Sequence, residues 1–177
     1  PTSAAGTSEG DFINSVSLGS INNLNSGGTN APTYTDNSAT MSTSLEQGDT
    51  YTIDIQSGDY AQDNYAAWID YDQDLNFEAG EKLGEFATTM SMENGSITFT
   101  VPAGAMLGNT RMRVRGVYHN TGEPTPTDPC YSYDYGETED YGITITSSGG
   151  SGGYCIPTSE FGTSDGDFIN GVTLEDI

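Results

Sequence analysis

The chain has 177 residues, of which 26 are Asp or Glu and four are Lys or Arg, so its formal net charge is −22. This charge argues against binding to nucleic acid or to an anionic membrane surface, because phosphate contacts need clustered Lys and Arg. No apolar run is long enough for a membrane span, and the many Gly, Ser, Thr, Asn and Asp residues favour short strands joined by turns over helices.

Alternation of apolar and polar residues predicts a series of short strands. In chain order these are residues 12–18, 50–55, 65–71, 82–87, 97–101, 112–118 and 141–145, with turn-forming residues between them. The pattern is typical of an all-β protein, an antiparallel β-sandwich of immunoglobulin-like kind, with helix nearly absent. Trp68 is the only tryptophan, and we expect it to anchor the core rather than a sugar-binding surface.

The end of the sequence repeats its beginning. Residues 157–177 (PTSEFGTSDGDFINGVTLEDI) match residues 1–21 (PTSAAGTSEGDFINSVSLGSI) at most positions without a gap. We therefore predict a module at residues 1–147, a Gly/Ser linker at 148–153 and the start of a second repeat at 154–177, as in a tandem array. The second copy would expose an apolar strand edge by itself, so we expect it to dock on a neighbouring module or chain.

An acidic segment after the third predicted strand has the spacing of a calcium-binding loop. Positions 1, 3, 5, 7 and 12 of the pattern D-x-[DN]-x-[DN]-G-x5-E are occupied by Asp70, Asp72, Asp74, Asn76 and Glu81. Alternate carboxylates on a tightly wound loop converge on one point, which favours Ca²⁺ over an ordinary acidic turn and over Mg²⁺. Glu81 can close the shell with two oxygens. Position 6 is Leu75 instead of glycine, so we expect a loop flatter than in an EF-hand, and two alternatives stay open for the last ligand: Glu81 itself, or Glu78 or a carboxylate from elsewhere in its place.

A second acidic cluster lies near the end of the module, at Glu137, Glu139 and Asp140. In a strand, Glu137 and Glu139 project from the same face. Two roles stay open for the cluster: it completes a calcium shell, or it opposes a row of arginines that share one strand face, Arg111, Arg113 and Arg115. Because cations are so few, we interpret the arginine row as an internal charge ladder rather than as an anionic ligand site.

The two cysteines, Cys130 and Cys155, suggest an oxidising, extracellular setting. Cys155 lies two residues before the second copy begins, so it belongs by register to the next module. Cys130 pairs either with Cys155 or with the equivalent cysteine that would precede Pro1. We favour the second pairing.

Three segments together resemble the GEVED domain: AAWIDYDQDLNFEAGEKLGE, NTRMRVRGVY and CYSYDYGETEDYGITIT. The Gly-Glu-Val-Glu-Asp motif of that family occurs at residues 136–140, with Thr138 in place of valine. The resemblance extends over nearly all of residues 1–147. It implies an immunoglobulin-like sandwich in a large secreted or surface-anchored bacterial protein, often of Bacteroidetes, and it assigns no catalytic residue.

The sequence does not favour an enzyme. Its only histidine is His119, and no pairing of Cys with His indicates a nucleophile and base. We expect instead a calcium-stabilised structural repeat of a giant extracellular adhesin or filament that mediates cell-surface attachment. Its partners would be neighbouring repeats of the same protein, in a homo-oligomer or filament, and a surface glycan or protein.

An accessory glycan- or protein-binding module is the alternative. In a strand, side chains two residues apart share a face, and this spacing is found at Tyr131, Tyr133 and Tyr135. These tyrosines would form an exposed aromatic platform together with Tyr60, Tyr65 and Tyr118. We rank this hypothesis second, because tyrosine-rich strand faces often serve only sandwich packing.

Overall fold

The computed structural model describes residues 3–118 and 128–148. Their regular structure is almost entirely β, apart from the single 3-10 turn η1 (Ala79–Glu81), as the composition predicts. The strands are β1 (Ser3–Gly6), β2 (Ile13–Leu18), β3 (Ile21–Leu24), β4 (Tyr34–Asp36), β5 (Ser42–Glu46), β6 (Thr50–Ser57), β7 (Asp63–Ile69), β8 (Lys82–Ala87), β9 (Asn94–Thr100), β10 (Gly108–Tyr118) and β11 (Tyr133–Thr146).

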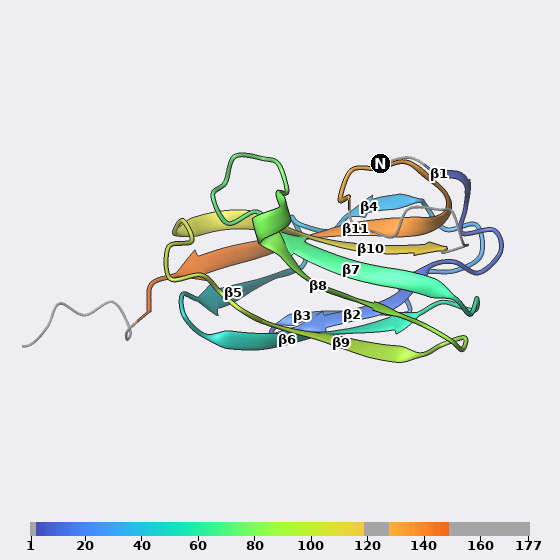
Figure 1. Ribbon diagram of the computed structural model, residues 1–177, viewed down its shortest axis with the longest axis horizontal. Helices are drawn as coiled ribbons and strands as arrows, with labels where there is room; N and C mark the ends of the chain where they lie inside the picture. The colour runs from blue at the N-terminus through green and yellow to red at the C-terminus, as the bar shows by residue number, and fades with distance from the viewer. Residues whose placement is uncertain (1–2, 119–127, 149–177) are drawn as a thin grey trace, which may run out of the picture.

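The strands form two sheets packed face to face, which confirms the predicted all-β sandwich (Figure 1). The larger sheet has the order β1-β11-β10-β7-β8, with β4 and β5 also paired to β11, and the smaller sheet has the order β3-β2-β6-β9. One feature departs from an antiparallel sandwich: β1, β4 and β5 all run parallel to β11. The larger sheet is therefore mixed, because the 14-residue β11 is long enough to pair with several short strands along one edge.

The hydrophobic core lies between the two sheets. Residues at every second position of the strands point inward, as the alternation in the sequence predicts. Ala67 and Ile69 of β7 face the core from the larger sheet, and Ile53 and Ile55 of β6 do so from the smaller sheet; all four are at most 1% exposed. This packing fixes which side chains of β7, β10 and β11 remain for the outer face of the larger sheet.

Trp68 is buried, but on the other side of the larger sheet. Its neighbours along β7, Ala67 and Ile69, belong to the core cluster, whereas Trp68 does not. The strand register places Trp68 opposite Arg113 of β10 and Lys82 of β8, and the Lys82 Nζ lies 5.7 Å from the ring centroid. The prediction that Trp68 is a buried core residue is confirmed, since it is 1% exposed, and it lies outside the cluster between the two sheets.

Candidate cation-binding site

The acidic loop, which we define as residues 70–81, connects β7 to β8 and is anchored on β10. The Asp70 N–H donates to the carbonyl of Arg111 at 3.1 Å. In the other direction, the hydroxyl of Thr110 donates to the carbonyl of Asp70. The first residue of the loop thus has a fixed position at the end of the larger sheet.

Carboxylate oxygens converge within the acidic loop, as the spacing predicts. Asp70, Asp72 and Asp74 each offer an oxygen within 4.8 Å of the others. A second such group consists of Asp72, Glu78 and Glu81, so Asp72 is shared by both. Asn76 donates its side-chain amide to the Asp74 carboxylate at 3.1 Å.

Asp70 is the innermost of these acids. It is only 3% exposed, and its Oδ2 accepts the N–H of Leu75 at 3.1 Å. Its buried Oδ1 has no hydrogen-bond partner, which is unusual because buried polar atoms are nearly always paired. Burial raises the pKa of the Asp70 carboxyl, and the charge of Glu81 acts in the same direction.

The loop takes a left-handed turn at Leu75, so the expectation of a flatter loop is wrong. Leu75 has φ +74°, and Gln73 has φ +58°. The Leu75 side chain is 90% exposed, so no packing compensates for the cost of this conformation in a residue with a Cβ. The backbone adopts the sharp turn of a calcium loop without the glycine that usually permits it.

Glu81 holds the backbone of the loop together. Its Oε1 accepts the N–H of Tyr71 at 2.5 Å and, more weakly, that of Asp72 at 3.4 Å. Its Oε2 accepts the N–H of Glu78 at 3.1 Å. A hydrogen bond to Glu81 raises the pKa of the Glu78 carboxyl. Sequence spacing indicated Glu81 only as a ligand and missed this bracing role.

Glu137 and Glu139 do share a strand face, but the structure does not bring them to the acidic loop. Both are 1% exposed and point between the sheets. The Glu137 carboxylate accepts the N–H of Ile13 at 2.9 Å, while that of Glu139 accepts the Asn23 amide at 3.3 Å and the Tyr141 hydroxyl at 2.7 Å. They therefore attach the β2–β3 hairpin to β11, and neither belongs to the carboxylate groups found among the described residues.

Burial shifts the titration of both glutamates. Desolvation raises the pKa of Glu137 to about 8, and the neighbouring charge of Glu139 adds to the shift. Desolvation also raises the pKa of Glu139 to about 7.

The predicted charge ladder is confirmed for two of its arginines. Arg113 donates to both oxygens of Asp140, and Arg111 forms ion pairs with Asp140 and Asp36. Arg115 differs, because within residues 3–118 and 128–148 it donates to the main-chain carbonyls of Asp128 and Tyr131 and forms no ion pair with a carboxylate. The third acid of the second cluster therefore neutralises arginines on the outer face.

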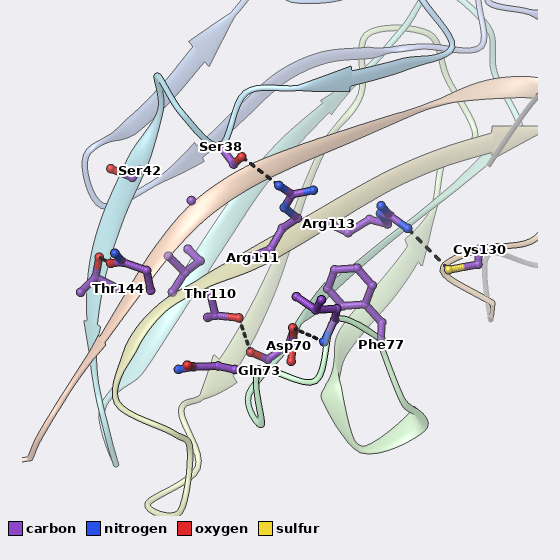
Figure 2. Close-up of a pocket in the computed structure, with 14 residues that line it drawn as sticks. Ser38, Ser42, Asp70, Gln73, Phe77, Thr110, Arg111, Arg113, Cys130 and Thr144 are labelled. Carbon is purple, nitrogen blue, oxygen red and sulfur yellow. Dashed lines mark hydrogen bonds between the residues drawn. The ribbon is translucent and has the colours of Figure 1, made fainter.

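A groove of about 760 Å³ lies beside the acidic loop, on the outer face of the larger sheet. Figure 2 shows Asp70 and Phe77 on one side of it, Ser38 on the other, and the arginines between them. The Cys130 Sγ lies 3.6 Å from Nη1 of Arg113. Further lining residues carry hydroxyl, amide or apolar groups: Ser42, Gln73, Leu75, Asn109, Thr110, Gly142, Ile143 and Thr144.

The predicted tyrosine platform does not form one exposed face. Tyr133 is buried beneath Arg115, whose guanidinium carbon lies 4.7 Å from the ring centroid. Tyr131 is exposed. Tyr65 is in the core, where its ring stacks on Phe86 at 5.3 Å. The prediction fails because β11 is covered on its outer face at this point, where an alternating strand was expected to face solvent.

The cysteine pairing and the second repeat stay predictions. Cys130 is exposed and is not in a disulfide, and Cys155 lies outside the described residues, as does nearly all of 148–177. The register of β1, in which Ser3 pairs with Tyr133, places the start of that strand beside the segment that contains Cys130. In the described ranges, 3–118 and 128–148, there is no helix long and apolar enough to cross a membrane.

Comparison with known proteins adds a family. No curated protein matches the chain. One similar solved structure is the sulfur carrier protein SoxY from Chlorobium limicola f thiosulfatophilum, with 10% identity, a TM-score of 0.37, and coverage of 76% of this chain and 82% of that chain. Residues 64–144 match the GEVED domain, a range that contains the acidic loop, the arginine row and the motif at 136–140. The chain therefore carries a GEVED domain.

Proposed function

We propose that this chain is a calcium-stabilised structural unit of an extracellular adhesin or filament that mediates attachment at the cell surface. The convergence of Asp70, Asp72 and Asp74 supports the calcium part, since their oxygens lie within 4.8 Å of one another. The orphaned Oδ1 of the buried Asp70 is the single observation that carries it, because a cation would supply the missing partner.

Calcium suits this loop better than magnesium. Ca²⁺ takes six to eight oxygen ligands in flexible geometry, whereas Mg²⁺ demands near-octahedral geometry and keeps several waters. An ion held by Asp70 and Asp74 would tie the end of β7 to the middle of the loop. It would bind only the folded chain, so it would raise the free energy of unfolding.

Thermal unfolding with excess calcium, and separately with excess chelator, tests this part of the proposal. At about a hundredfold excess over Kd, calcium adds about 2.7 kcal/mol, so we expect the midpoint to rise by about 5–10 °C. Asp74→Asn should abolish the rise. Asp54→Asn, an exposed control on the smaller sheet, should keep it. An unchanged midpoint in the parent chain would reject the calcium site.

The repeated segment is the basis for proposing that modules of this kind are joined in series. Residues 157–177 repeat residues 1–21, and in the first copy this segment supplies β1 and β2. We expect the second copy to dock on a neighbouring module, so the 177-residue chain should associate in sedimentation experiments and a chain ending at residue 147 should not. If both chains sedimented as monomers, docking between copies would be contradicted.

A glycan- or protein-binding module is the second candidate, and the groove beside the acidic loop favours it. Its hydroxyl and amide groups, with the ring of Phe77 and the charge of Arg111, are the polar and aromatic mixture found in ligand sites. Selective binding on a glycan array that is lost in Arg111→Ala, but kept in Thr52→Ala on the exposed face of β6, would promote this function over the first.

A further inference from the structure

A second, smaller pocket of about 250 Å³ lies away from the acidic loop. Among the described residues it is lined by Glu9, Asp11, Tyr60, Tyr118 and Tyr135. Glu9 and Asp11 belong to the turn between β1 and β2, and the tyrosines come from the β6–β7 connection, the end of β10 and the start of β11. The volume is below the roughly 300–1,000 Å³ usual for drug-sized ligands, so the pocket suits a small group.

The three tyrosine rings form walls instead of a flat platform. The Tyr60 and Tyr118 rings lie 5.4 Å apart at 85°, and the Tyr118 and Tyr135 rings lie 6.2 Å apart, also at 85°. Rings at right angles to one another turn their faces and edges in different directions. A sugar ring stacks on a flat aromatic surface, whereas a compact cation is held by several ring faces around it.

Behind the rings lies a pair of buried acids. Asp11 is 2% exposed and Asp63 is 0% exposed, and each has a buried Oδ1 without a hydrogen-bond partner. The other oxygen of Asp63 accepts the Tyr65 hydroxyl at 3.1 Å. Burial raises the pKa of Asp63 to about 8, and the adjacent charge of Asp11 adds to this shift. Burial also raises the pKa of Asp11. Among the described residues that line the pocket, two are acidic and none is basic.

Contacts between distant segments build this pocket. The N–H of Tyr60 donates to the carbonyl of Gly10 at 3.1 Å, and a Cβ at Gly10 would lie 3.0 Å from that nitrogen. The β1–β2 turn is thus pressed against the β6–β7 connection, which brings Asp11 to Tyr60. The second copy of the repeat keeps both acids, with Asp165 in the position of Glu9 and Asp167 in the position of Asp11.

We propose that the pocket of Glu9, Asp11, Tyr60, Tyr118 and Tyr135 binds an organic ammonium group. Ring faces and carboxylates together are the groups that attract alkylammonium ions. A calcium ion fits less well, because no group of three carboxylates within 4.8 Å is found here among the described residues. This inference does not depend on the acidic loop or on the proposed function.

Choline is the probe, and its uncharged isostere 3,3-dimethyl-1-butanol is the matched control ligand. Both are titrated into the 177-residue chain while saturation-transfer difference NMR detects their methyl protons. Excess calcium is present throughout, so that the acidic loop does not compete. We expect saturation transfer to choline at low millimolar concentration and at least fivefold less to the neutral isostere. Equal signals from the two compounds, or no signal from choline, would overturn the proposal.

Three variants locate the site. Tyr118→Leu and Glu9→Gln should each weaken choline binding by roughly five- to thirtyfold. Tyr118→Phe keeps the ring and should stay within about twofold of the parent chain. Tyr131→Ala removes an exposed tyrosine outside the pocket and should have no effect. Melting curves confirm that each variant is folded, and a choline affinity unchanged in both Tyr118→Leu and Glu9→Gln would refute this location.

Discussion

Asp140 and Arg113 meet through two parallel hydrogen bonds on the outer face of the larger sheet. Nε lies 2.7 Å from Oδ1 and Nη2 lies 2.8 Å from Oδ2. The Asp140 side chain is fully buried, whereas the nearby pair of Arg111 with Asp36 is about two-fifths exposed on both sides. Asp140, the last residue of the motif at 136–140, thus anchors β11 to β10 at a buried position where water cannot take over its hydrogen bonds.

We predict that Asp140→Asn lowers the free energy of unfolding by about 3–5 kcal/mol, because Arg113 would keep a buried charge without its partner. Asp36→Asn breaks only an exposed pair and should cost at most about 1 kcal/mol. Urea unfolding of both variants measures the difference. Similar losses in the two variants would show that burial does not make the Asp140–Arg113 pair more stabilising than the exposed pair of Asp36 and Arg111.

The bracing and ligand roles in the acidic loop are separable. Glu81→Gln leaves at least one of the N–H groups of Tyr71 and Glu78 without an acceptor, so it should destabilise the chain by about 1–3 kcal/mol even in chelator. Asp74→Asn should have little effect in chelator and should lower stability only when calcium is present. Unfolding of each variant with and without calcium measures both effects. If Glu81→Gln lost stability only when calcium is present, the bracing role of Glu81 would be contradicted.

Leu75→Gly should stabilise the chain by up to about 1 kcal/mol. Glycine removes the cost of φ +74°, which outweighs its greater freedom in the unfolded chain. The exposed Leu107 is the matched control, since it is not among the residues with positive φ, and Leu107→Gly should destabilise. Chemical unfolding decides the sign, and a loss of stability in Leu75→Gly would contradict a strained turn.

The glutamates of the motif should make stability depend on pH. Both have an ordinary pKa of 4.5, which burial raises to about 8 for Glu137 and about 7 for Glu139. The folded chain therefore holds protons that the unfolded chain has released. This contribution is complete below 4.5 and is lost as the pH rises to about 8, so the free energy of unfolding should fall across that window.

Glu137→Gln tests this, because glutamine still offers an oxygen to the Ile13 N–H. The variant should show a flatter pH dependence and should be more stable than the parent chain at about pH 8. Asp59→Asn removes one exposed charge and should leave the slope unchanged. Hydrogen bonds from Ser38 lower the pKa of Asp36 below its ordinary value of 3.8, so Asp36 changes the free energy of unfolding only at pH values near and below 3.8. Equal slopes for parent and Glu137→Gln would show that Glu137 is ionised in the fold.

The strands that the sequence predicted are those with a strong two-residue period. The alternation at residues 50–55 and 97–101 reappears in β6 and β9, whose pairing places Ile53 opposite Ile97. The short strands β1, β3, β4 and β5 were not predicted, because three to five residues with small or polar side chains resemble a loop. They are strands only because β11 and β2 offer edges on which they pair.

The candidate site was predicted less completely. The convergence of Asp70, Asp72 and Asp74 follows from local spacing and could be derived without the fold. The roles of Glu81, Glu137 and Glu139 could not, since their partners are main-chain and side-chain groups supplied by folding. The pocket at Asp11 and Tyr60 also escaped prediction, although the recurrence of both its acids in residues 157–177 was a signal in the sequence.

The parallel pairing of β1 with β11 has a mechanical consequence. Tension that pulls the two ends of the module apart acts at the start of β1 and at the end of β11, which lie at opposite ends of the sandwich (Figure 1). Strands that run side by side in the same direction are then loaded in shear, so their hydrogen bonds must break together instead of unzipping singly. For its short length, this pairing therefore resists tension along the chain better than a hairpin of equal length would.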